Sequence, residues 1–131
     1  MAEPSDIRRL AFPSLQTADG PFTHLVLDGT YAFVSGVVAS DVPGGAAALG
    51  DIAQETEVVM TAIREGLAHI GLGMERILRV DVHITDIGHM AELDRAYARY
   101  FSTGAFPART CTQSGGLAGK SNVEITVLAR L

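Results

Sequence analysis

A polar set near the C-terminus carries the residues best suited to chemistry. Arg109, Cys111 and Gln113 alternate along one predicted strand, and Glu124 and Thr126 alternate along the next. Burying the valines of the second strand while solvating the arginine favours a hairpin that pairs Cys111 with Glu124. Arginine can hold a carboxylate by two parallel hydrogen bonds, and glutamate can orient or deprotonate water. These residues predict an anion pocket, with a purely structural Arg109–Glu124 pair as the alternative.

Three other patterns resemble functional motifs but lack an essential part. The glycine-rich segment 114–121 has Ser114 where a phosphate-binding loop begins with glycine, and a strand follows it where that loop needs a helix. Ser35 lacks the preceding glycine of a hydrolase elbow, because Phe33 stands there. The four histidines show no metal-ligand spacing, so the sequence predicts no metal site.

Two amphipathic helices are predicted to position this polar set. The first extends from Asp51, a candidate N-cap, to Leu72, and its apolar stripe leaves Glu55 on another face. The second extends from about Ile87 to Phe101 and has Asp86 as its candidate cap.

Strands are predicted on both sides of these helices. Residues 78–85 alternate between apolar and polar, with Leu78 in the apolar row, and residues 109–114 and 122–128 form the C-terminal hairpin. Asp28–Gly29 is a turn dipeptide that would pair Leu27 with Thr30 and place Phe22 opposite Ser35. The resulting order predicts an α+β fold, a single sheet with two helices packed on one face.

The first hairpin is apolar on both of its faces. A sheet with one solvated face would instead alternate between apolar and polar residues. A second copy of the chain covering the other face explains this pattern and predicts a homo-oligomer. A monomer whose loops half cover that face is the alternative. The two apolar sets are Leu25, Leu27, Ala32 and Val34, and Phe22, Val26, Tyr31 and Phe33.

Composition sets the class of protein. The 131 residues predict one domain spanning 1–131, and a net charge of −5 disfavours binding to nucleic acid. The N-terminal twelve residues lack the apolar core of a signal peptide, and no apolar run is long enough to span a membrane. The single cysteine fits a reducing compartment, so the predicted location is cytoplasmic.

Three segments resemble the Rid family, also called the YjgF family, whose founding members are reactive-intermediate imine deaminases. They are residues 33–36 (Phe-Val-Ser-Gly), 106–111 (Phe-Pro-Ala-Arg-Thr-Cys) and 123–125 (Val-Glu-Ile), and the similarity covers about residues 21–131. The resemblance implies a chorismate-mutase-like α+β fold and a homotrimer with pockets in the clefts between subunits. It implies no cofactor and no metal.

The resemblance also implies roles for single residues. Arg109 matches the arginine that binds the substrate carboxylate, Cys111 a pocket cysteine, Glu124 the glutamate that positions water, and Ser35 a serine lining the cleft. Phe22, also a candidate wall of the substrate pocket, replaces the tyrosine of well-studied deaminases.

Two further departures concern the substrate. Asp94, a candidate substrate-binding residue, and Val37 stand where those members have asparagine and glutamine. A carboxylate at Asp94 would repel an anionic substrate or pair with a positive group.

The implied activity is hydrolysis of small 2-imino or enamine acids to 2-keto acids and ammonia. Arg109 would fix the substrate and Glu124 would orient or partly deprotonate the water, which makes both catalytic candidates. A non-catalytic binding module for small carboxylate metabolites, using the same arginine pocket, is the alternative. A ribonuclease or translation inhibitor, a third function ascribed to this family, conflicts with the acidic net charge.

Overall fold

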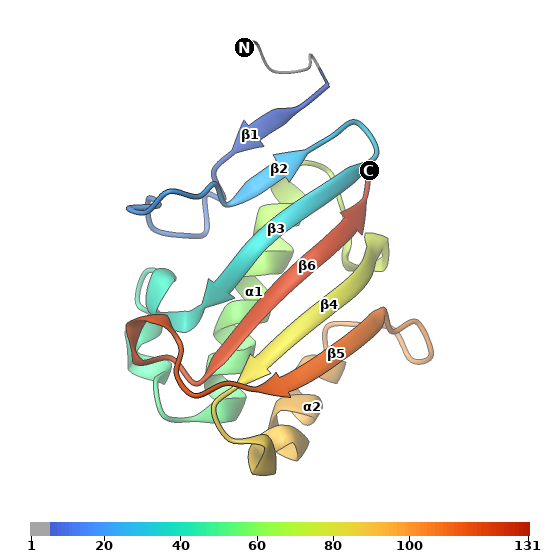
Figure 1. Cartoon of the computed structure of the whole chain (residues 1–131). Helices are drawn as coiled ribbons and strands as arrows, with labels where there is room; N and C mark the ends of the chain where they lie inside the picture. Colours follow the sequence, from blue (N-terminus) through green and yellow to red (C-terminus); the bar gives the residue numbers. More distant parts are fainter. Residues whose placement is uncertain (1–5) are drawn as a thin grey trace.

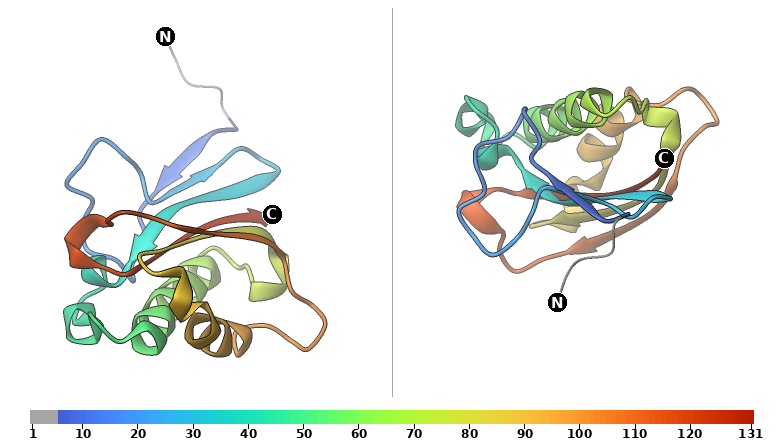
Figure 2. Two further views of the ribbon diagram at one scale, coloured as in Figure 1. Left: turned by 60° about the horizontal axis from the view of Figure 1, so that its bottom comes forward. Right: turned by 90° about the horizontal axis from the view of Figure 1, so that it is seen from above.

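The computed structural model describes residues 6–131 and is built on one six-stranded sheet in the order β1-β2-β3-β6-β4-β5 (Figure 1). β4 and β5 pair in parallel, and the other neighbouring strands pair antiparallel. Both α-helices lie on one face, which confirms the predicted α+β class (Figure 2). The strands are β1 Arg8–Leu10, β2 Leu25–Leu27, β3 Tyr31–Val38, β4 Ile77–Ile84, β5 Ala108–Gln113 and β6 Val123–Arg130.

Both predicted caps form, but only α1 begins directly at its cap. Asp51 accepts a hydrogen bond from the Gln54 N–H at 3.0 Å, immediately before α1 (Ile52–His69). Asp86 accepts from the Gly88 N–H at 2.8 Å and caps a 3₁₀ turn that leads into α2. This turn makes α2 (Met90–Ala98) shorter than predicted. Among residues 6–131, no helix is long and apolar enough to cross a membrane. The N-terminal segment expected to lack a signal peptide begins with residues 1–5, which lie outside the described residues.

Glu55 was predicted to lie on a face of the first helix away from the apolar stripe. In the structure its side chain is fully buried in α1. Its carboxylate accepts hydrogen bonds from the Gly50 N–H, the Asn122 N–H and the Asn122 side-chain amide, at 2.8 to 2.9 Å. These bonds compensate for the lost hydration of the carboxylate. Glu55 therefore ties the start of α1 to the segment that enters β6.

The core lies between the sheet and the helices. β4 and β6 contribute alternating apolar side chains to it, and Leu67 of α1 and Leu93 of α2 are fully buried against them. Leu78 does not belong to this row: an irregularity between Ile77 and Arg79 leaves it 44% exposed, and Ile77 is buried instead. The core residues of the two strands are Ile77, Val80, Val82, Ile84, Val123, Ile125 and Val127.

The predicted C-terminal hairpin is wrong. β4 lies between β5 and β6, and the connection after β5 crosses the end of β4 (Figure 1). Arg109 is level with Val80 of β4, on the helix-covered face, whereas Glu124 is level with His83 on the other face. Cys111 pairs with Val82 and not with Glu124. The predicted cross-strand pair therefore does not exist.

The N-terminal hairpin forms with a different register from the predicted one. Asp28 pairs with Tyr31, because Gly29, with φ of 90°, and Thr30 make the turn. The Asp28 carboxylate accepts hydrogen bonds from the N–H groups of Thr30 and Tyr31. His24, and not Phe22, is consequently opposite Ser35.

The two apolar sets of this hairpin do face opposite sides of the sheet. Leu25, Leu27, Ala32 and Val34 are buried beneath the helices. Phe33 belongs to the opposite set and is 45% exposed. No helix covers that side of the sheet (Figure 2). We call that side the outer face. The loops of a single chain do not cover Phe33, which is consistent with the predicted second copy.

Candidate functional site

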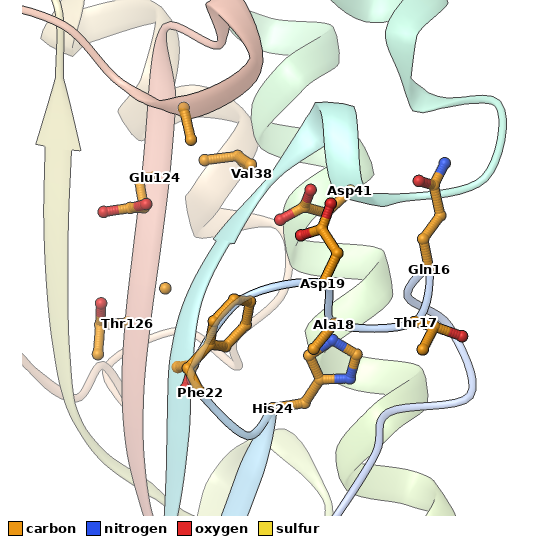
Figure 3. Close-up of a pocket in the computed structure, with 13 residues that line it drawn as sticks. Gln16, Thr17, Ala18, Asp19, Phe22, His24, Val38, Asp41, Glu124 and Thr126 are labelled. Carbon is orange, nitrogen blue, oxygen red and sulfur yellow. The ribbon is translucent and has the colours of Figure 1, made fainter.

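A cavity of about 450 Å³ opens on the outer face, beside several of the candidate residues. Phe22, Ser35 and Glu124 all line this outer cavity. Phe22 and Glu124 are labelled in Figure 3. Glu124 and Thr126 project from β6, Ser35 comes from β3, and Phe22 comes from the loop before β2. The other lining residues are Gln16, Thr17, Ala18, Asp19, His24, Gly36, Val38, Asp41, Ala118 and Thr126.

A bulge in β3 shapes the floor of the outer cavity. The pairing with β6 shifts between Val34 and Val37, at Ser35 and Gly36. The Ser35 hydroxyl donates to the Thr23 carbonyl at 2.5 Å, so its oxygen keeps lone pairs for a ligand donor. A Cβ at Gly36 would approach the Glu124 Cδ to 2.8 Å. The missing side chain at Gly36 thus leaves room for the glutamate.

The side chain of Glu124 makes no hydrogen bond or ion pair with any residue in the described range 6–131, although its backbone is part of the sheet. Its carboxylate therefore remains available to water in the outer cavity. Asp19 and Asp41 also line this cavity, and none of the lining residues is a lysine or arginine (Figure 3). The cavity is consequently acidic and offers little to a phosphate group.

His24 is a cavity residue that the sequence did not single out. It is buried, and its Nδ1 accepts the Phe12 N–H at 3.1 Å. In the neutral ring the proton must then lie on Nε2. In the sequence His24 stands at the start of the first predicted hairpin, and this position does not indicate which group it contacts. No group of three His, Cys, Asp or Glu side chains within residues 6–131 is placed to hold a metal ion.

Arg109 lies in a second, separate cavity of about 240 Å³, which we call the arginine cavity. Its Nη1 is 2.7 Å from the Asp94 Oδ1, and its Cζ lies 5.0 Å from the centre of the Tyr97 ring. Both partners belong to α2, so the helix fixes the guanidinium from two sides. The cavity is lined by Asp94, Tyr97, Ala98, Phe106, Pro107 and Arg109.

Cys111 follows Arg109 on the same side of β5 and is partly buried, but it lines neither cavity. Burial raises the pKa of its thiol; the positive charge of Arg109 opposes this effect and the negative charge of Asp94 adds to it. A thiol with a raised pKa is mainly protonated at neutral pH and is a poor nucleophile.

Tyr97 has a buried hydroxyl without a hydrogen-bond partner in the described part of the chain. Burial raises its pKa from 10.0 to about 12; the Arg109 charge lowers it and the Asp94 charge raises it. Because the folded pKa is the higher one, the folded state holds this proton more tightly than the unfolded state. Its contribution to stability is complete below pH 10 and is lost as the pH rises toward 12.

We therefore expect the free energy of unfolding to fall more steeply above pH 10 in the parent than in Tyr97→Phe. Urea denaturation of both proteins across this range measures the difference. At neutral pH, losing an unpartnered hydroxyl should cost less than about 1 kcal/mol. Parallel stability curves would contradict the pKa assignment, and a larger loss at neutral pH would mean that the hydroxyl has a partner.

Apart from Cys111, the predicted site residues fall into two groups on opposite faces of one sheet. Phe22, Ser35 and Glu124 share the outer cavity, and Asp94 and Arg109 share the arginine cavity. The first group offers a carboxylate for water, and the second offers a guanidinium for an anion. Within a single chain the sheet separates them.

The fold and the two cavities define a small α+β protein with a mixed sheet, helices on one face and a divided polar site. The chain belongs to the Endoribonuclease L-PSP family, which includes the Rid proteins: residues 14–131 match the family. Protein DfrA of Myxococcus xanthus is 34% identical over 94% of this chain and 98% of its own. The RutC family protein y4sK of Sinorhizobium fredii is 27% identical over 87% and 90%.

Solved structures agree with this assignment. YyfA from Yersinia pestis, a protein of unknown function of the conserved Rid protein family, superposes with a TM-score of 0.88 at 25% identity. The match covers 95% of this chain and 99% of YyfA. The predicted family and fold are both confirmed.

Proposed function

We propose that this chain hydrolyses small 2-imino or enamine acids to 2-keto acids and ammonia, in a cleft shared by two copies of a homotrimer. The observation that carries the proposal is the division of Arg109 and Glu124 between opposite faces of the sheet. An arginine cavity at the edge of one copy, set against the outer cavity of the next, would bring them together. Association would also cover Phe33 on the outer face.

The reaction requires few groups because imines are reactive. In the proposed cleft Arg109 binds the substrate carboxylate, and Glu124 accepts a proton from the attacking water. The water oxygen bonds to the carbon of the protonated imine, which gives a carbinolamine, and Glu124 returns the proton to the nitrogen. The hydroxyl group then loses its proton as the keto group forms, and the carbon–nitrogen bond breaks to release ammonia, which takes up that proton as ammonium. Ser35, whose hydroxyl oxygen can accept a hydrogen bond, and Phe22 form the wall beside the water. Positioning of the substrate and general base catalysis by Glu124 together account for the acceleration of hydrolysis.

A ribonuclease function, which the name of the Endoribonuclease L-PSP family suggests, is less well supported. RNA binding depends on lysine and arginine contacts to phosphate, whereas the chain has a net charge of −5. The outer cavity is lined by Asp19, Asp41 and Glu124. These carboxylates favour a small substrate that presents a positive or neutral group.

Ammonia release from freshly made imino acids tests the proposal. An amino-acid oxidase generates the imino acids in situ, and ammonia formation is followed with and without the protein. We expect acceleration over the control. Binding of small carboxylates without acceleration would contradict the deaminase function and favour the binding module.

The oligomer is tested separately by light scattering. A particle of about three times 13.8 kDa is expected. A stable monomer at micromolar concentration would contradict the shared cleft.

Cys111→Ala is expected to keep deamination within a fewfold of the parent rate, because the protonated thiol lies outside both cavities. Initial rates on one imino acid, normalised to folded protein, check this. A loss of a hundredfold or more in a folded variant would instead assign the sulfur a covalent role.

A further inference from the structure

We infer that Asp94 sets the ligand class of the arginine cavity, which favours a ligand carrying both a carboxylate and a positively charged nitrogen over a simple anion. The inference rests on the proposed function and narrows its substrate to the protonated imine, a zwitterion. It depends on three features of the cavity: a paired guanidinium, donors that the pair leaves free, and an exposed carboxylate oxygen.

The first feature is that the Arg109 charge is already matched. Its Nη1 lies 2.7 Å from the Asp94 Oδ1, and the Tyr97 ring supports the guanidinium from another side. The cavity therefore holds one positive and one negative charge at contact distance. A ligand with a single negative charge meets attraction from Arg109 and repulsion from Asp94, so the two effects largely cancel.

The second feature is the number of donors that remain. A guanidinium carries five N–H groups, and Asp94 contacts only one of its nitrogens. No other hydrogen bond to the Arg109 side chain is found within residues 6–131. The other donors can still bind a carboxylate while the ion pair stays intact.

The third feature is the exposure of Asp94, whose side chain is 45% exposed against 22% for Arg109. Its Oδ2 makes no hydrogen bond within the described range. This oxygen can accept an N–H from a cationic nitrogen. A protonated 2-imino acid carries its nitrogen and carboxylate on adjacent carbons, so it can contact Asp94 and Arg109 together. A keto acid offers only the carboxylate.

Asp94→Asn tests this inference because it removes the charge and keeps the shape of the side chain. Alanine and pyruvate are matched probes, a zwitterion and a monoanion with the same carbon skeleton, and calorimetry measures their Kd. The parent is expected to prefer alanine. In Asp94→Asn we expect the Kd of alanine to rise about tenfold and that of pyruvate to fall about tenfold, which reverses the preference.

Two further variants separate this role from a general loss of charge. Glu92→Gln removes a carboxylate from the same helix outside the arginine cavity, and both Kd values should stay within twofold. Asp94→Glu keeps the charge and should keep the preference for alanine.

Equal shifts of both probes in Asp94→Asn, or no shift, would overturn the inference. So would failure of the parent to bind alanine more tightly than pyruvate. These measurements need no turnover, so an absence of ammonia release would refute the deaminase function without deciding the role of Asp94.

Discussion

Arg109→Lys is expected to lower kcat/KM for imino-acid hydrolysis by roughly tenfold to a hundredfold. Lysine keeps the positive charge but loses the planar fork that holds a carboxylate with parallel hydrogen bonds. Losing one charge-assisted hydrogen bond costs on the order of 1.5 to 3 kcal/mol, which corresponds to that range of rates. The effect should be large because Asp94 already contacts Nη1 and leaves the substrate the remaining donors.

A matched control is available on α1. Arg64 lies over the Tyr100 ring at 5.1 Å, as Arg109 lies over Tyr97 at 5.0 Å, but it lines neither cavity. Arg64→Lys should leave kcat/KM unchanged. The melting temperature is measured on the same preparations. A lower melting temperature with unchanged turnover in Arg109→Lys would mean that Arg109 only braces α2 through Asp94.

The elements of this fold were predictable because their signals are local. The Asp51 and Asp86 caps and the apolar periods of both helices each depend on a few neighbouring residues. The alternation of β6 likewise assigned Val123, Ile125 and Val127 to the core. Burial of Glu55 was not predictable in this way, because its partners Gly50 and Asn122 are brought to it by the tertiary fold.

The pairing of strands was harder to predict. Apolar and polar residues alternate in the same way whether two strands pair directly as a hairpin or a third strand lies between them. The α2 crossover makes β5 parallel to β4, and β4 fills the position beside β6 that a hairpin would have given to β5. This single difference moved Arg109 to the helix-covered face. The sequence identified the candidate residues but could not show that Arg109 and Glu124 lie on opposite faces of the sheet within one chain.

Glu124→Gln should lower kcat by roughly a hundredfold to ten-thousandfold, the range that general base catalysis contributes. Glutamine has the same size but cannot accept a proton from water. Because Gly36 leaves room for a side chain of this shape, the variant is expected to fold normally. Steady-state rates give kcat and KM, and KM should change little. Glu65→Gln on α1, exposed and outside both cavities, is the control.

Mixed trimers then determine whether the two catalytic candidates act across an interface. Arg109→Ala and Glu124→Gln chains, carrying different tags and co-expressed, are purified through both tags so that every trimer contains both. In either mixed composition, one of the three clefts combines an intact Arg109 from one copy with an intact Glu124 from its neighbour. About one third of the parent turnover per trimer should return, although each variant alone is nearly inactive. A site within one chain would restore nothing, because no chain in the mixture carries both residues.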